Sequence, residues 1–386
     1  MKAEYKQEWD MYLKKEIAEI TPFLTELGFV LDVEQPHVGG ERYLMSGRKI
    51  ILIGYRKSDG KKAIIKISSD PLEKNEIERE RNLREILLNL NFSYKTFLFP
   101  EELVFARRGK YVIYATAYIE QENPFLGRSL EEQFFLALRI FEAQEGFHAT
   151  ASSHIKKIKG KFRKSNVHEL FASNAREYML SFEKFEKSVL ANDPDNKRVA
   201  EVIGRAKEII FKNHVAIERY SSFLTHADCA PHNLRVSVKD IYLLDYTSMH
   251  FGNKYEGWAR FLNFMVIFNQ PLEIALVDYV RQNRGEEEYL VLRLMRMYKI
   301  CFLLKYYTEA LTKTSGDLHE IARLGVEFWT DALQSIIDNE VLPEEKIRLF
   351  NQKRELLRSE EEKKRQKEIG HSASRFFYKE GGKSSR

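Results

Sequence analysis

The hydrophobic periodicity changes near residue 124, and this change limits the fold more than any other feature of the chain. Before it, short β-rich runs alternate with helical segments. Two isoleucine-rich runs within 48–68 flank Ser58-Asp59-Gly60, a sequence typical of a β-hairpin turn. Two further β-rich runs, at 102–108 and 110–119, meet at Gly109. The beginning of the chain therefore predicts a small antiparallel sheet.

Two helices accompany this sheet. Apolar residues recur at helical spacing in 8–28, and again in 73–90 between the two pairs of strands. The order strand, strand, helix, strand, strand predicts a sheet with one helix packed on it. We expect residues 1–120 to form this first lobe.

The chain beyond Pro124 has a helical pattern. Ser129 and Glu132 have the spacing of a capping box at the start of a buried helix. Further amphipathic helices are expected at 167–190, 197–222, 258–283, 286–313 and 317–340. Only SVKDIYLLDY interrupts them with β character. The predicted fold class is α+β, with a larger helical lobe over 121–345.

Charge is concentrated at the end of the chain. The net charge is +5, from 62 Lys and Arg against 57 Asp and Glu. Residues 351–386 hold 11 basic and 6 acidic residues, so they carry a charge equal to that of the whole chain. A neutral body argues against a nucleic-acid-binding fold with a basic face. We expect 346–386 to be a partly disordered, solvated tail that folding does not need and that is a candidate contact for an anionic partner.

Cysteine content and hydropathy indicate the compartment. The two cysteines, Cys229 and Cys301, form no C-x-x-C pair and no disulfide framework, as expected in a reducing cytoplasm. No apolar run is long enough to span a membrane, and the first residues lack the apolar core of a signal peptide. We therefore expect a cytoplasmic protein without a membrane span.

One short stretch carries the chemistry. Residues 225–234 read THADCAPHNL, and the β-rich run after them ends on Asp245 in LLDY. A carboxylate at the end of an apolar strand costs free energy unless it is paired or bound to a metal. The spacing of Asp228, Asn233 and Asp245 resembles the H-x-D-x-x-x-x-N loop and metal-binding aspartate of the protein-kinase-like superfamily. It is most similar to the aminoglycoside phosphotransferase and choline kinase branch.

Two other segments share this resemblance. AIIKIS, with Lys66, looks like the lysine segment on the third strand of that family, and FEAQEGFHAT, with His148, looks like the end of the helix before the catalytic loop. The resemblance implies a bilobal kinase-like fold. It also implies transfer of a phosphoryl group from ATP or GTP, with Mg²⁺, to a hydroxyl of a small molecule.

The resemblance also assigns roles to residues. Asp228 would accept the proton of the substrate hydroxyl. Asn233 and Asp245 would offer oxygens to Mg²⁺, which prefers hard ligands. Lys66 would hold the α- and β-phosphates. The loop would be braced by His226 and His232.

Two assignments have weaker signals. The partner of Lys66 could be Glu76, Glu80 or Glu85, and Glu80 is preferred because it shares the apolar face of its predicted helix. The phosphate-covering loop has no G-x-G-x-x-G motif. Gly47, just before a predicted strand, is the preferred residue over Gly39 and Gly40.

The sequence departs from the family in two places. The segment GNKYEGWARFL, with Asn253, lacks the additional aspartate that the family commonly has, which puts the bracing of the loop in doubt. There is no A-P-E activation segment of an ordinary protein kinase. A glutamate triplet at 286–288 could line a site for a cationic substrate, but a solvated helix start is favoured.

Two other functions compete with the kinase interpretation. One is a pseudokinase that binds nucleotide without transferring phosphate, against which the retained motif residues count. The other is a metal-dependent hydrolase with His226, Asp228 and His232 as ligands. A hydrolase would need further ligands, and the remaining histidines show no paired spacing.

Overall fold

A five-stranded antiparallel sheet forms the first lobe of the computed structural model, which describes residues 2–38, 48–149, 172–237 and 240–368. The strand order is β1-β2-β3-β5-β4. The strands are β1 (Phe29–Leu31), β2 (Ile50–Arg56), β3 (Lys62–Ser68), β4 (Glu102–Arg108) and β5 (Tyr111–Ala117). Both predicted hairpins are confirmed, with Gly60 at φ +69° and Gly109 at φ +53° in the turns, a conformation that glycine adopts without steric cost.

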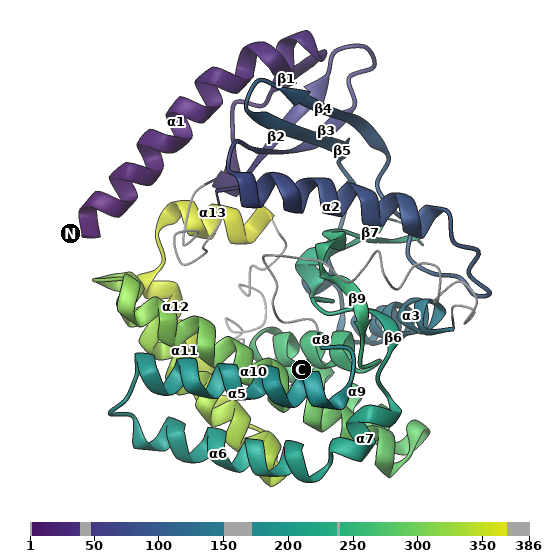
Figure 1. Ribbon diagram of the computed structural model, residues 1–386, viewed down its shortest axis with the longest axis vertical. Coiled ribbons are helices and arrows are strands. Elements are labelled where there is room, and N and C mark those ends of the chain that lie inside the picture. Colours follow the sequence, from purple (N-terminus) through teal and green to yellow (C-terminus); the bar gives the residue numbers. More distant parts are fainter. Residues whose placement is uncertain (1, 39–47, 150–171, 238–239, 369–386) are drawn as a thin grey trace, which may run out of the picture.

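Two helices cover opposite faces of this sheet (Figure 1). α1 (Lys2–Glu26) packs on one face, partly through Ile20. α2 (Pro71–Leu88) packs on the other through Ile77. Successive side chains of a strand point to opposite faces of the sheet. Ile65 and Ile67 of β3 are buried on the face that α1 covers, so Lys66, which lies between them in the sequence, points to the face that α2 covers.

The segment after β5 leads into a second, mostly helical lobe (Figure 1). The backbone N–H of Tyr118 donates to Lys62 in the first lobe (2.9 Å), and Gln121 accepts from the backbone of Val236 in the second (3.0 Å). This linker therefore contacts both lobes. The main helices that follow are α3 (Leu130–His148), α5 (Ala175–Asn192), α6 (Lys197–Lys212), α7 (His214–Arg219), α8 (Glu256–Phe268), α9 (Gln270–Arg284), α10 (Glu286–Lys313) and α11 (Asp317–Asp338).

Two predicted helices are each divided in the structure. The predicted helix at 197–222 breaks at Asn213, which lies between α6 and α7. The predicted helix at 258–283 breaks at Asn269, where α8 ends and a side chain caps α9. Pro271 in the first turn of α9 has no N–H to continue the previous helix.

Two short β-ribbons interrupt the helices, where one β-rich run was expected. β7 (Leu234–Ser237) pairs with β8 (Asp240–Leu243), as that run predicts. β6 (Phe223–His226) pairs with β9 (Met249–Gly252) and was not predicted. Strands of four residues are too short for an alternating pattern to be recognised.

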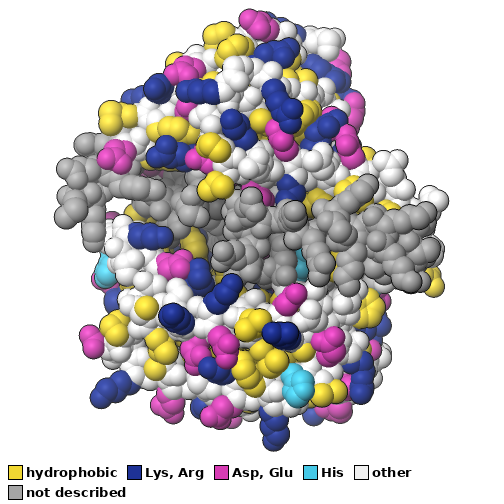
Figure 2. Space-filling view, viewed as in Figure 1, with side chains coloured by type: hydrophobic (Ala, Val, Ile, Leu, Met, Phe, Trp, Pro, Cys, Tyr) yellow, Lys and Arg dark blue, Asp and Glu magenta, His cyan; other side chains and the backbone are white. Residues whose placement is uncertain are grey.

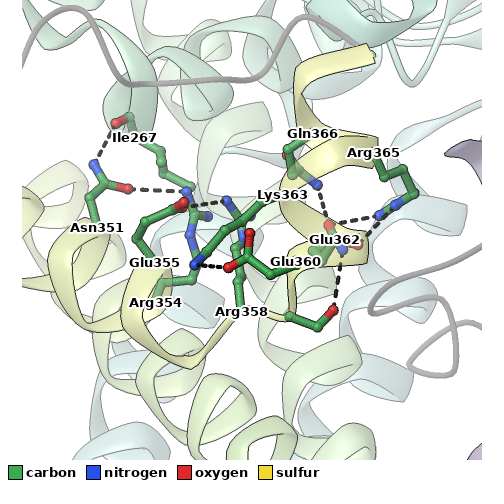
Figure 3. Close-up of polar contacts among 11 residues, drawn as sticks. Ile267, Asn351, Arg354, Glu355, Arg358, Glu360, Glu362, Lys363, Arg365 and Gln366 are labelled. Atoms are coloured by element: carbon green, nitrogen blue, oxygen red, sulfur yellow. Dashed lines mark hydrogen bonds and ion pairs between the residues drawn. The ribbon is translucent and has the colours of Figure 1, made fainter.

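The segment expected to be a solvated tail instead packs on the body as far as Glu368. α12 (Glu344–Leu357) lies on the second lobe, where Phe350 stacks on Phe328 with ring centroids 4.2 Å apart. Asn351 donates to the carbonyl of Ile267 at the end of α8 (2.9 Å; Figure 3).

α13 (Glu360–Glu368) returns to the first lobe. It packs against the short helix η1 (Pro36–Val38), and the Tyr118 hydroxyl donates to Glu368 (2.9 Å). The side chain of Glu362 is fully buried and accepts from Arg365 (Figure 3). The prediction of a solvated tail is therefore wrong for this helix. Phe376, Phe377 and Tyr378, further along the predicted tail, lie outside the described residues.

Acidic and basic side chains are interspersed on the face of the molecule drawn in Figure 2. Over the parts of the chain that the structure describes, no helix is long and apolar enough to cross a membrane.

Candidate active site

The β7–β8 hairpin brings two predicted site residues together. Asn233 directly precedes β7, and Asp245 follows β8 by two residues. The N–H of Leu244 donates to the carbonyl of Asn233 (2.8 Å), which continues the ladder of the hairpin. The backbone of Asp245 is in the left-handed region, with φ 54° and ψ 72°. Such strain in a non-glycine residue is concentrated at functional sites.

Asp228 is held by three side chains. Arg260 of α8 donates from Nε to Oδ1 (2.5 Å), and Asn233 donates from Nδ2 to Oδ2 (2.9 Å). His232 Nε2 lies 3.7 Å from Oδ2. Burial alone would raise the pKa of Asp228, but the Arg260 charge and His232 hold that pKa well below its ordinary value. Asp228 is therefore a carboxylate over the whole neutral range.

Asp245 is the second partly buried carboxylate of this region. Its Oδ1 accepts from the Thr247 hydroxyl (2.5 Å), and its backbone carbonyl lies 2.9 Å from His226 Nε2. Burial opposes ionisation, but the charges of Lys49 and Lys66 hold the pKa of Asp245 below its ordinary value. Positive groups from the first lobe thus act on a carboxylate of the second.

Lys66 forms an ion pair with Glu80 of α2. The Lys66 side chain is 14% exposed and that of Glu80 3%, so Lys66 does not occupy a solvent-facing strand position. Glu76 and Glu85, the other candidates, pair instead with arginines of α2 itself (3.8 and 2.6 Å). Gly47, Gly39 and Gly40, the candidate phosphate-loop residues, lie outside the described residues.

α2 also contacts the second lobe directly. Arg79 donates to the carbonyl of Thr247, two residues after Asp245 (2.5 Å). Sequence reasoning missed Arg79, Lys49 and Arg260. A signal existed for Arg260, because it is the one charged residue in the apolar run GWARFLNFMVIF and a charge on a buried helix needs a partner.

A buried cluster surrounds Glu256, in the segment where the resemblance implied an additional aspartate. Glu256 contacts Lys299 (2.5 Å), His250 (2.8 Å) and the hydroxyl of Tyr178 (2.8 Å). Burial opposes its ionisation, but the Lys299 and His250 charges lower the pKa of Glu256 to about 2. Asn253 is fully buried and accepts the Tyr255 N–H (3.0 Å). These buried contacts brace the loop after β9, and they were not predicted from the sequence.

Gly257 allows α8 to approach the loop before Asp228. A Cβ at this position would lie 2.7 Å from the carbonyl oxygen of His226 and 1.9 Å from Gln144 Nε2. We expect Gly257→Ala to lower the free energy of unfolding by about 1–3 kcal/mol, because a backbone oxygen has no room to move. Gly204→Ala in α6 is the control: no atom lies within 4 Å of its added Cβ, and alanine favours a helix by up to about 1 kcal/mol. Urea unfolding of both variants tests this, and equal stabilities would contradict it.

The burial of the His148 ring predicts that the stability of the protein depends on pH. Both ring nitrogens are shielded from solvent and have no hydrogen-bond partner among the described residues, and the ring meets Phe223 edge-on (5.7 Å). Burial, followed by the charge of Lys254, lowers the pKa of His148 from 6.5 to about 3. The unfolded chain takes up this proton below pH 6.5 and the folded chain does not. His148 therefore lowers the free energy of unfolding by about 1.4 kcal/mol for each unit by which the pH is lowered below 6.5.

His148→Phe should remove this part of the slope. Between pH 7.5 and 5.5 the variant should lose about 1.4 kcal/mol less than the parent protein in urea unfolding. Parallel pH profiles for the two proteins would show that His148 takes up its proton in the folded state.

The glutamates at 286–288 are paired. Glu286 contacts Arg281 (3.3 Å), Glu287 forms an ion pair with Arg219, and Glu288 contacts Lys254 (2.9 Å). This agrees with the favoured interpretation of an ordinary helix start.

Neither family models nor curated protein sequences match this chain. Solved structures do. A thermostable mutant of aminoglycoside phosphotransferase APH(4)-Ia matches with a TM-score of 0.55 at 12% identity, covering 82% of this chain and 97% of that one. Macrolide 2'-phosphotransferase type I gives 0.52 at 12% identity, covering 81% and 97%. The enzyme MphH from Brachybacterium faecium gives 0.50 at 12% identity, covering 81% and 98%. The chain thus has the bilobal fold of aminoglycoside and macrolide phosphotransferases, which confirms the predicted fold class.

Proposed function

We propose that this protein is an ATP- and Mg²⁺-dependent phosphotransferase that phosphorylates a hydroxyl of a small molecule. One observation carries the proposal. Asp228, Asn233 and Asp245 lie together around the β7–β8 hairpin. The ion pair of Lys66 and Glu80 in the first lobe lies opposite them. Phosphoryl transfer requires little covalent chemistry from the protein and much positioning and charge stabilisation. Each of these groups suits that task.

Asp228 would orient the acceptor hydroxyl. Its two oxygens have about four lone-pair sites, and the three contacts to Arg260, Asn233 and His232 leave room for another donor. A carboxylate with a lowered pKa is a weak base. The proton would therefore move to Asp228 late in the reaction, which suits a loose transition state.

Asn233 and Asp245 fit a magnesium site. The amide nitrogen of Asn233 is used in donating to Asp228, and no described residue donates to its amide oxygen. The Asp245 carboxylate is ionised and only its Oδ1 has a hydrogen-bond partner among the described residues. Two hard oxygens of this kind are what Mg²⁺ takes from a protein when phosphates and water complete its shell. The ion would neutralise phosphate charge.

Lys66 would contact the phosphates, and Glu80 would fix its position. Structures of proteins with a similar fold support the proposal that the site takes a nucleotide and a small acceptor. APH(4)-Ia is described in a ternary complex with ADP and hygromycin B, at 12% identity and a TM-score of 0.52. It is also described with AMP-PNP and hygromycin B.

Calorimetric titration with ATP, with and without Mg²⁺, tests the proposal. Lys66→Met should weaken binding by about tenfold or more, because it removes a charge-assisted contact to phosphate. Lys61→Met is the control, since Lys61 lies next to the same strand and forms an exposed ion pair with Glu101. A chain that binds no nucleotide, or binds it equally well in both variants, would rule out this function.

The two competing functions are less well supported. A hydrolase would need a set of metal ligands, and no group of three or more His, Cys, Asp or Glu side chains is placed to hold a metal within the described ranges. His226 Nε2 is already engaged by the Asp245 carbonyl. A pseudokinase would bind Mg²⁺ and ATP but consume none, so turnover with a panel of hydroxyl compounds separates it.

A further inference from the structure

A cavity lies in the second lobe between α8, α9, α10 and the end of α11, away from the catalytic loop. Val266 of α8 lines it, whereas Arg260, which contacts Asp228, is on a different face of the same helix. The cavity encloses about 150 Å³. A cavity of that size has room for a molecule as large as benzene, and its lining is partly apolar and partly charged. Its apolar wall is formed by Val266, Ile274, Val277, Leu292, Ala332 and Ile336.

Three arginines line the cavity, Arg281, Arg293 and Arg296, and they differ in their partners. Arg296 is buried and forms an ion pair with Glu273 (2.6 Å). Arg293 has no carboxylate partner among the described residues. Its Nη2 donates to the carbonyls of Ile336 and Ile337 at the end of α11 (3.0 and 3.2 Å). Its Nη1 has no hydrogen-bond partner among the described residues and, unlike Nε, is not shielded from solvent.

The surroundings of Arg293 are positive and aromatic. Burial lowers the pKa of Arg293, and the charges of Arg296 and Arg281 lower it further. The guanidinium groups of Arg281 and Arg293 lie 5.4 and 5.9 Å from the centre of the Tyr289 ring. The carboxylates of Asp278 and Glu340 also line the cavity, but both residues are exposed, so water and salt screen them.

We propose that this cavity binds a small carboxylic acid with an apolar body. The carboxylate accepts a hydrogen bond from Arg293 Nη1, and the body packs against Tyr289 and the apolar wall. A charged acceptor forms a short, strong bond with guanidinium. The site is separate from Asp228 and does not depend on the proposed phosphoryl transfer.

Benzoate is a suitable probe because its ring matches the cavity in size. We expect saturable binding in calorimetry, with a dissociation constant on the order of 1 mM for a ligand of so few atoms. Benzamide, which has the same shape without the charge, should bind about tenfold more weakly or not at all. The Asp228→Asn variant should bind benzoate as the parent does.

Variants assign the binding to the cavity. Arg293→Met keeps the apolar stem and should weaken benzoate binding by about tenfold or more. Arg323→Met is the control, since Arg323 is an exposed residue of α11 that does not line the cavity and contacts Glu320 (2.8 Å), so the affinity for benzoate should stay within about threefold. Because Arg293 also holds the end of α11, a second variant is needed: Ala332→Met keeps every charge and fills the space.

Each outcome decides the question. Loss of benzoate binding in both Arg293→Met and Ala332→Met, with retention in Arg323→Met, supports the site. Binding that persists in Ala332→Met, equal affinity for benzamide, or no saturation by benzoate up to tens of millimolar would overturn it.

Discussion

Asp228→Asn is expected to reduce the rate of phosphoryl transfer by about 10²–10⁴-fold, the usual contribution of a positioned general base. Nucleotide affinity should stay within a few-fold, because Asp228 is proposed to act on the acceptor and not on ATP. Steady-state turnover and ATP titration of the same preparation measure the two effects separately.

Asp240→Asn is the matched control for this variant. Asp240 lies on the same hairpin, in β8, and its side chain is 48% exposed and 3.9 Å from Lys95. It should retain parental turnover. If Asp228→Asn turned over as fast as Asp240→Asn, the role proposed for Asp228 would be lost.

Asp245→Asn is expected to abolish the Mg²⁺-dependent part of the stabilisation by ATP. Ligand at about 100 times its dissociation constant stabilises a folded protein by about 2.7 kcal/mol, and removing the carboxylate removes the ion's charged ligand. Asparagine is the better replacement because it tolerates the left-handed backbone that Asp245 adopts (φ 54°). Alanine would add strain that is unrelated to the metal.

Thermal melting with ATP, with and without Mg²⁺, provides the measurement. The parent protein and Asp240→Asn should gain stability only when both are present. A gain of the same size in Asp245→Asn would refute the metal assignment.

Local patterns predicted much of the first lobe and of the site. The hairpin turns at Gly60 and Gly109 are determined by neighbouring residues, so the sequence contains their signal. Glu80 was preferred over its neighbours because of its place on a helical face, and the structure pairs it with Lys66. Local periodicity is sufficient for such features because a single helix or turn defines them.

Contacts between distant elements were not predictable. Arg260 meets Asp228 only because α8 crosses the loop that holds Asp228, and that crossing depends on the close approach at Gly257. The β6–β9 ribbon consists of two short strands that are separated in the sequence by residues 227–248. The charged composition of α13 suggested a solvated segment, but Glu362 is buried. In each case the tertiary partner, and not the local sequence, decides the result.

The docking of α13 adds a third kind of contact between the two lobes. The linker after β5 joins them through the chain, and α2 meets the second lobe through Arg79 and Thr247. The contact of α13 with η1, carried by α12 from the second lobe, lies at a different place on the first lobe. A twist between the lobes that keeps the linker in place therefore still requires α13 to separate from η1. We expect α13 to restrain the motion of the two lobes relative to each other.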